Sequence, residues 1–200
     1  MYTKVRGYKV VSRFFPHQVR EMPLLLDVLE RFESPTWECL YVLLLWLSSM
    51  VLVPFPLHRG TPSPAERIHR LSTRFLSRPG KERDAASIVL GRLYARQESE
   101  VLFSAFLQGA EQATASLEPT GVLQTLCAFV KQADASVIRA HYDAMLRVIA
   151  HLRTVDARNM LVDRYAIKLE GRLAMQDPRD SHVDTLLHAC LLYTSPSPRD

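Results

Sequence analysis

A single uninterrupted apolar run constrains the fold of this chain more than any other feature. Residues 40–53 contain no charged side chain, carry two serines in their middle and stop at Pro54. The run is shorter than the roughly 18 to 20 residues that a membrane span needs. A helix that is apolar on every side must be covered by neighbours on more than one side. The run therefore predicts a buried helix within a packed helical array.

The composition favours helices over strands. Apolar residues make up 48% of the 200 residues and charged residues 23%, as in ordinary globular proteins. The chain has only 7 glycines, and Leu, Ala, Arg and Glu are abundant, whereas alternating runs of Val, Thr and Tyr are few. These residues favour helix formation, so we expect a fold without a sheet.

Prolines and capping residues predict where several helices begin. A helix over residues 24–32 would place Pro23 in its first turn, and Ser34-Pro35 would supply the N-cap and first position of the apolar helix. Ser63-Pro64-Ala65-Glu66 fits a capping box. In it, the side chains of serine and glutamate each accept a hydrogen bond from the backbone amide of the other residue.

Apolar stripes and breaks recur along the chain. The clearest stripe is Ile138, Tyr142, Met145, Ile149 and Leu152, and a weaker one is Leu102, Ala105, Phe106 and Ala113. Breaks fall in a proline-rich loop at residues 54–63 and near residues 97–99, 118–121, 133–136, 153–157 and 176–181. Helix pairs thus recur at roughly 35 to 45 residues, the spacing of HEAT or armadillo units. We predict an all-α fold, a HEAT/armadillo-like α-solenoid of antiparallel helix pairs, with an irregular helical bundle as the alternative.

Several segments resemble consecutive landmarks of the tubulin folding cofactor D (tubulin-specific chaperone D) family. They are Lys4-Val5-Arg6-Gly7-Tyr8-Lys9, Phe14-Phe15-Pro16-His17, Trp37-Glu38 with Tyr41, Leu43-Leu44-Leu45-Trp46-Leu47-Ser48, Pro54-Phe55 and the helix opening Lys81-Glu82-Arg83-Asp84-Ala85-Ala86. Gly121-Val122-Leu123-Gln124 and Lys168-Leu169-Glu170-Gly171-Arg172-Leu173 are weaker matches in the same order. The resemblance is specific over residues 3–55 and 81–96.

The resemblance implies a chaperone that acts on tubulin after its release from the chaperonin. Such a protein binds β-tubulin, works with tubulin folding cofactors E and C and an Arf-like small GTPase, and helps to assemble or disassemble the αβ-tubulin heterodimer. Stimulation of GTP hydrolysis would belong to the multi-protein complex. The implied location is the cytoplasm and the microtubule cytoskeleton.

Both ends of the chain suggest a fragment. Residues 190–200 resemble one reading frame of a transposase-type sequencing adapter, with a genuine Ser-Pro tail as the alternative, so we expect them to be unstructured. The motif at residues 4–9 lies well inside the chain in the family that it resembles. We therefore expect residues 1–189 to be an internal piece of a helical array that is poorly soluble when expressed alone.

The sequence contains no pattern for catalysis, a cofactor or a metal. The seven histidines form no i, i+4 pair beside a carboxylate and are expected on helix surfaces or loops. Cys39, Cys127 and Cys190 lack metal or redox spacing, and the first two are expected to be small buried apolar groups. We expect Arg83 and Asp84 to hydrogen-bond to each other at a helix start. The prediction is a non-catalytic binding protein without a cofactor or metal.

The net charge of +4 is spread over single basic residues. No basic tract or aromatic stacking platform indicates nucleic-acid binding, whereas a mild positive charge suits an acidic protein partner such as tubulin. The candidate partner-contact residues share two helical sides and are Arg6, Lys9, Arg13, Arg67, Arg70 and Arg74. Arginine is enriched in binding hot spots, but a merely solvated face is the alternative for each.

Three other functions are left open. The chain is alternatively a generic HEAT-repeat scaffold or trafficking adaptor without tubulin specificity. It is alternatively a membrane-interface protein held through residues 40–53, although that run lacks the charged face of an interfacial helix. A third alternative is an enzyme whose active site lies outside this chain.

Overall fold

The computed structural model describes residues 10, 12–16, 18–32, 36–112 and 117–176. Throughout this part of the chain every regular element is a helix, which confirms the predicted all-α class. The elements are η1 (Ser12–Phe14), η2 (Val19–Glu21), α3 (Met22–Arg31), α4 (Trp37–Met50), α5 (Pro64–Phe75), α6 (Lys81–Tyr94), η3 (Gln97–Ser99), α7 (Glu100–Glu111), α8 (Pro119–Gln132), α9 (Ala135–Ala140), α10 (Tyr142–Val155) and α11 (Met160–Gln176).

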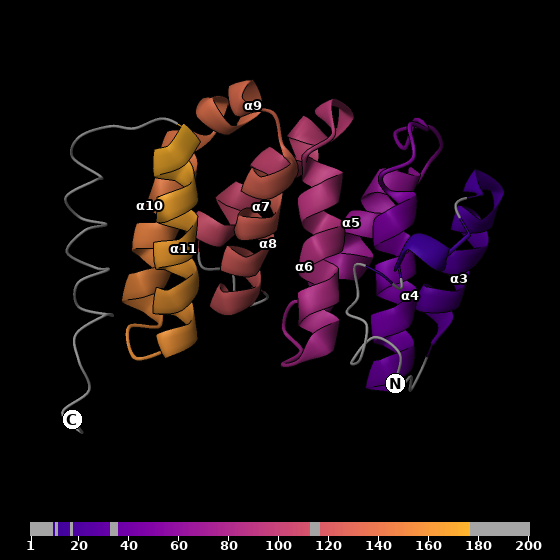
Figure 1. Ribbon diagram of the computed structural model, residues 1–200, viewed down its shortest axis with the longest axis horizontal. Coiled ribbons are helices and arrows are strands. Elements are labelled where there is room, and N and C mark those ends of the chain that lie inside the picture. The colour runs from indigo at the N-terminus through magenta and orange to yellow at the C-terminus, as the bar shows by residue number, and fades with distance from the viewer. Residues whose placement is uncertain (1–9, 11, 17, 33–35, 113–116, 177–200) are drawn as a thin grey trace.

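The long helices form two layers. In the first, which we call the groove layer, α6 packs between α4 and α8, and α8 also contacts α11. In the second, the back layer, α3 packs on α4 and α5, α5 on α6, α7 on α10, and α10 on α11. Figure 1 shows the helices following one another along the longest axis, from α3 at one end to α10 and α11 at the other. This arrangement is the predicted α-solenoid.

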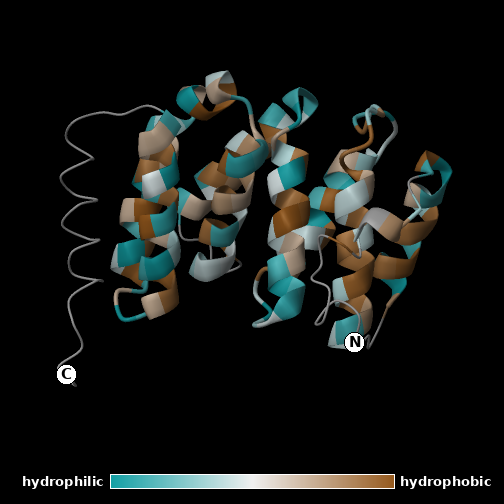
Figure 2. Cartoon of the chain, viewed as in Figure 1, coloured by the Kyte–Doolittle hydropathy of each residue, from teal (hydrophilic) through white to brown (hydrophobic). Residues whose placement is uncertain are grey.

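Helix α4 confirms most of the buried helix that the apolar run predicts, but it ends at Met50, and Val42 and Leu52 of the run are exposed. Its fully buried apolar side chains are Leu40, Leu44, Leu45, Leu47 and Met50. They are covered by α3 on one side and α6 on the other, and Figure 2 shows the hydrophobic residues along α3 and α4. The hydroxyls of Ser48 and Ser49 donate to the Leu45 carbonyl at 2.7 and 3.2 Å, which satisfies them inside this apolar environment. None of the described helices combines the length and apolar character that crossing a membrane requires.

Two of the predicted helix starts are confirmed. The amide of Glu66 donates to Ser63 Oγ at 3.2 Å and the amide of Ser63 donates to Glu66 Oε2 at 2.8 Å, which forms the capping box of α5. Pro23 lies in the first turn of α3, where a missing amide hydrogen costs no helical hydrogen bond.

The predicted start of the apolar helix is wrong. Helix α4 begins at Trp37, and its N-cap is Thr36, whose hydroxyl accepts a hydrogen bond from the Cys39 amide at 3.5 Å. Ser34 and Pro35 lie outside the described residues. Thr36 takes the capping role because its extended backbone and hydroxyl stand directly before the first helical residue.

Three further details of the predicted pattern are corrected. Residues 118–121 open α8 instead of separating two helices, because the Glu118 carboxylate caps its first turn. The apolar stripe from Ile138 to Leu152 is divided at His141, where α9 ends and α10 begins. In α7 Ala105 is exposed. The buried residues of α7 are Phe103, Phe106, Leu107 and Ala110.

An aromatic cluster joins the two layers at the centre of the array. The Tyr94 ring lies 5.2 Å from the Phe103 ring and 5.1 Å from the Phe106 ring, and Phe103 stacks on Phe129 at 4.1 Å between centroids. The Tyr94 hydroxyl is 2.9 Å from Nδ1 of His69. His69 is therefore a half-buried partner of the cluster instead of the expected surface residue, and burial lowers its pKa.

Residues 51–63 connect α4 to α5 without a helix, and the chain just after α6 holds them in place. Arg96 donates to the carbonyls of Val51 and Val53 at 2.8 and 2.9 Å and to that of Phe55. Glu98 accepts a hydrogen bond from the Leu57 amide at 3.1 Å. Burial raises the pKa of Glu98, but its hydrogen bonds outweigh burial, so this pKa lies below the ordinary value. A proline-rich connection is thereby fixed by one arginine and one glutamate.

Candidate functional site

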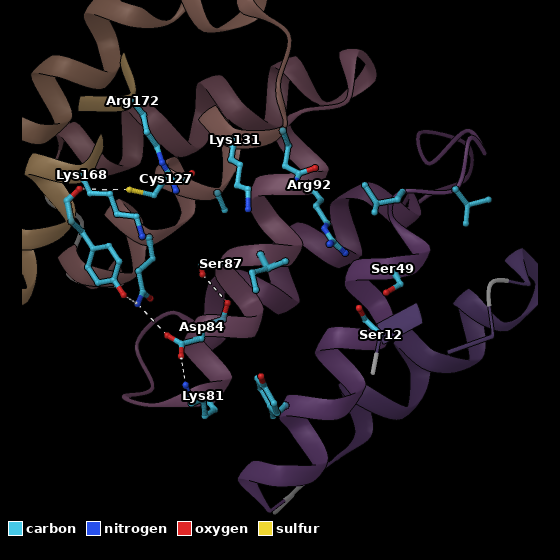
Figure 3. Close-up of a pocket in the computed structure, with 18 residues that line it drawn as sticks. Ser12, Ser49, Lys81, Asp84, Ser87, Arg92, Cys127, Lys131, Lys168 and Arg172 are labelled. Carbon is cyan, nitrogen blue, oxygen red and sulfur yellow. Dashed lines mark hydrogen bonds and ion pairs between the residues drawn. The ribbon is translucent and has the colours of Figure 1, made fainter. Parts of the chain in front are cut away.

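A groove of about 720 Å³ runs across the groove layer, and Figure 3 shows its lining residues. Its walls come from α4, α6, α8 and α11, with Ser12 of η1 and the first residues after α4. The cationic lining residues are Lys81, Arg92, Lys131, Lys168 and Arg172. Among the described residues, the single carboxylate of the lining is Asp84. The groove is therefore basic, although the chain as a whole has only a small positive charge.

Small residues allow the central helices of the groove to cross closely. A Cβ atom added to Gly91 of α6 would lie 2.5 Å from Cβ of Ala128 and 2.8 Å from the amide nitrogen of Phe129, both in α8. Real Cβ atoms do not approach so closely, so this crossing requires glycine at position 91. The close crossing also brings α6 and α8 side chains within hydrogen-bond distance at the floor of the groove.

Arg83 and Asp84 do not form the expected pair. Arg83 lies 3.1 Å from Glu118, the N-cap of α8. Asp84 accepts hydrogen bonds from Gln124 Nε2 and Lys81 Nζ, each at 3.1 Å. Neighbouring residues on a helix point in different directions, so the two side chains reach different partners. The motif thus connects α6 to α8 at two points.

The floor of the groove is polar. Gln124 is 8% exposed, and its Nε2 donates to the Tyr165 hydroxyl at 2.8 Å as well as to Asp84. Its Oε1 accepts no hydrogen bond from the part of the chain that the structure describes. The floor therefore carries a buried acceptor beside the Asp84 carboxylate.

Cys127 also lies in the floor, as a buried thiol. It is 4% exposed, as the sequence predicts, whereas Cys39 is only half-buried. Burial raises the pKa of Cys127 to about 11, although Arg172 and Lys168 lower it in part. A thiol with this pKa is protonated at neutral pH and reacts slowly.

Two arginines of the groove are held by backbone carbonyls. Arg92 donates to the carbonyl of Ser48 at 2.8 Å and to its hydroxyl at 3.0 Å, which links α6 to α4. Arg172 donates to the carbonyl of Cys127, which links α11 to α8. Carbonyl groups carry no net charge, so these bonds orient the guanidinium groups without neutralising them.

The partner-contact candidates on α5 that the sequence suggests lie outside the groove. Arg67 of α5 donates to Asp27 at 2.6 Å and to Glu30 at 2.8 and 3.1 Å, which joins α5 to α3 in the back layer. These hydrogen bonds raise the pKa of Arg67 and lower that of Glu30. Arg70 is exposed and lies 3.4 Å from Glu30.

Of the remaining candidates, Arg74 does not line the groove. Arg74 is exposed, and its guanidinium lies 5.2 Å from the centroid of the Phe75 ring. Arg13 belongs to η1, while Arg6 and Lys9 lie outside the described residues. The α5 arginines therefore lie apart from the groove.

The basic groove was not predicted, although the sequence carries a signal for it. Arg92, Lys131 and Lys168 follow one another at intervals of 39 and 37 residues, which is the spacing of successive helix pairs. Basic residues repeated at that spacing fall on equivalent helices of a solenoid, whereas a search for continuous basic tracts overlooks them. Within the described ranges, no group of three or more His, Cys, Asp or Glu residues is placed to hold a metal ion.

The chain is similar to known proteins over its N-terminal and central parts. The sequence model of a family described as "Tubulin-specific chaperone D-like, ARM repeat" matches residues 1–114. The protein named Tubulin-folding cofactor D of Schizosaccharomyces pombe is 31% identical over 135 residues, which are 65% of this chain. The chain spans 12% of the length of that relative. No solved structure is significantly similar to this chain.

Proposed function

Because the chain belongs to the tubulin-specific chaperone D-like family of ARM-repeat proteins, we propose that it is part of a cytoplasmic tubulin-folding cofactor that binds β-tubulin. The complete protein would help to assemble or disassemble the αβ-tubulin heterodimer after chaperonin release. Tubulin folding cofactors E and C and an Arf-like small GTPase would act with it. Any stimulation of GTP hydrolysis would arise in that complex.

The contribution of this segment would be binding. The match over residues 1–114 carries the proposal, and the stack of helix pairs supports it because such stacks present long, semi-rigid surfaces to large partners. The basic groove of α4, α6, α8 and α11 is the surface that we assign to the partner. Its positive charge suits an acidic protein such as tubulin.

Capture of β-tubulin by the full-length protein that carries this segment tests the proposal. The immobilised protein should retain β-tubulin from a cell lysate, and an immobilised HEAT-repeat scaffold of another family should not. Chemical crosslinks from Lys131 and Lys168 to β-tubulin should identify the groove as part of the contact. Absence of β-tubulin from the captured material, or retention of trafficking-coat subunits in its place, would contradict the proposal.

A further inference from the structure

Large apolar side chains reach solvent mainly at the two ends of the array. Among the described residues, helices α5 to α9 expose only one of them, Val101 of α7. The first end, from residue 10 through α4, exposes Val10, Phe14, Leu24, Val28, Phe32, Trp37 and Val42. A helix inside the array has neighbours on both sides, whereas a helix at an end has a neighbour on one side. The exposed apolar groups therefore lie where a neighbouring helix is lacking.

Helix α3 stands at this end of the back layer, as Figure 1 shows. It meets α5 through Asp27 and Glu30, which accept hydrogen bonds from Arg67. Leu24 and Val28 are four residues apart and share a face of the helix. Their exposed fractions are 66% and 37%. The contacts of α3 with α4 and α5 thus leave an apolar face uncovered.

This face differs from the solvent-facing side of an internal back-layer helix. The exposed residues of α5 are all charged and are Glu66, Arg70 and Arg74. The exposed residues of α3 are mostly apolar and are Pro23, Leu24, Val28 and Arg31. A solenoid that ends in a capping unit has a polar outer face there. The outer face of α3 therefore has the composition of a contact surface instead of a cap.

We propose that Leu24, Val28 and Phe32, which we call the end face, form the seat of a further helix pair of the same polypeptide. This pair would pack on α3 as α3 packs on α5, which continues the back layer by one step. The chain spans 12% of the length of its relative, so a protein of that length has ample chain for further helix pairs. The inference goes beyond the proposed function, because it concerns a contact within the polypeptide and does not depend on tubulin.

The occupant of the end face is a helix with an apolar stripe. Its apolar side chains, spaced three or four residues apart, would meet Leu24 and Val28 across the interface. A separate protein fits less well. A stable interface between chains buries about 800 Å² per partner, and the three side chains of the end face cannot supply that area. A helix pair of the same polypeptide needs less area, because the linker holds it at a high effective concentration.

Photo-crosslinking in the purified full-length protein tests the inference. The photoreactive residue p-benzoylphenylalanine replaces Phe32 in one variant and Phe55 in another, because the two side chains are similarly exposed, at 39% and 37%. Phe55 lies in the connection between α4 and α5 and is the control. We expect crosslinks from position 32 to a segment of the same polypeptide outside residues 1–200. Crosslinks from position 55 should stay within residues 1–200.

Two matched variants measure the contact. L24Q/V28Q replaces two apolar groups of the end face, and V101Q/A105Q makes a similar change at two exposed residues of α7 that are also four apart. Glutamine is a good helix former, so a solvent-exposed face loses little by the change, whereas a covered face loses its apolar contacts. In the full-length protein the protection of α3 amides against hydrogen exchange should fall at least tenfold in L24Q/V28Q. The protection of α7 amides should change less than twofold in V101Q/A105Q.

The outcomes are distinct. Crosslinks from position 32 to a second copy, which double the mass of the product, or to added β-tubulin would overturn the inference. Crosslinks from position 32 that stay within residues 1–200, or equal protection of α3 in wild type and L24Q/V28Q, would also overturn it, because the end face would then face solvent. Crosslinks to a segment of the same polypeptide outside residues 1–200 would support it even in a protein that fails to capture β-tubulin.

Discussion

The back layer and the groove layer use their charged side chains differently. In the back layer arginines meet carboxylates across helices: Arg67 lies between Asp27 and Glu30, and Arg147 lies 2.8 Å from Glu111. In the groove layer Arg83 also pairs with a carboxylate, Glu118 at 3.1 Å, but Arg92 and Arg172 link neighbouring helices through bonds to backbone carbonyls. Both layers thus gain links between helices.

The difference lies in what happens to the charge. An ion pair between helices cancels the charge of both partners, whereas a bond from guanidinium to carbonyl leaves the positive charge in place. Arginine therefore serves cohesion in both layers, and in the groove layer it also contributes to a basic surface. If this comparison is correct, substitutions in the back layer should mainly lower stability, and substitutions of the groove cations should mainly weaken partner binding.

The largest expected effect is at the crossing of α6 and α8. G91A adds a Cβ atom where Ala128 and Phe129 leave no space, and we expect a loss of about 3 kcal/mol, at the upper end of overpacking costs. G171A is the matched control, because a Cβ atom there meets nothing within 4 Å. It should stabilise α11 by about 0.5 to 1 kcal/mol. Hydrogen exchange of α8 and α11 amides in the full-length protein measures both, and equal protection in the two variants would contradict the packing argument.

The next effect concerns the connection between α4 and α5. R96M removes the donors to the carbonyls of Val51, Val53 and Phe55, and we expect a cost of about 2 kcal/mol, as for hydrogen bonds to a charged group. Proteolysis within residues 51–63 should become faster. R59M, at an exposed position of the same connection, should leave the cleavage rate unchanged. Equal cleavage in wild type and R96M would show that Arg96 does not hold this connection.

A smaller and pH-dependent effect is expected in the back layer. R67M should cost about 1 kcal/mol, because the ion pair is partly exposed. The hydrogen bond from Arg67 lowers the pKa of Glu30, so the unfolded state binds more protons and the contribution is present above the ordinary glutamate pKa. It is lost as pH falls through the lowered pKa of the folded state. The protection factors of the α3 amides, relative to the intrinsic exchange rate at each pH, should therefore fall in acid in the wild type and change less in R67M, and identical acid profiles would contradict the assignment.

The sequence predicted local features better than relations between helices. The apolar run and the Ser63–Glu66 capping box depend on neighbours in the chain, and both are confirmed. The pattern of Arg67, Arg70 and Arg74 on one helix was visible, but the acids of α3 opposite Arg67 were not, since they stand about 40 residues earlier. The groove was overlooked for the same reason, because its cations come from three helices.

The smallest expected effect tests the groove layer directly. K168Q removes a cation that lies over the Tyr165 ring, and an exposed contact of this kind contributes only about 0.5 kcal/mol. Amide exchange of α11 should therefore hardly change, although the basic wall of the groove loses one charge. R153Q is the contrasting variant on the back layer, because Arg153 pairs with Glu170 at 2.7 Å and links α10 to α11. A larger loss of α11 protection in K168Q than in R153Q would mean that groove cations hold the array together, and the division between the two layers would not stand.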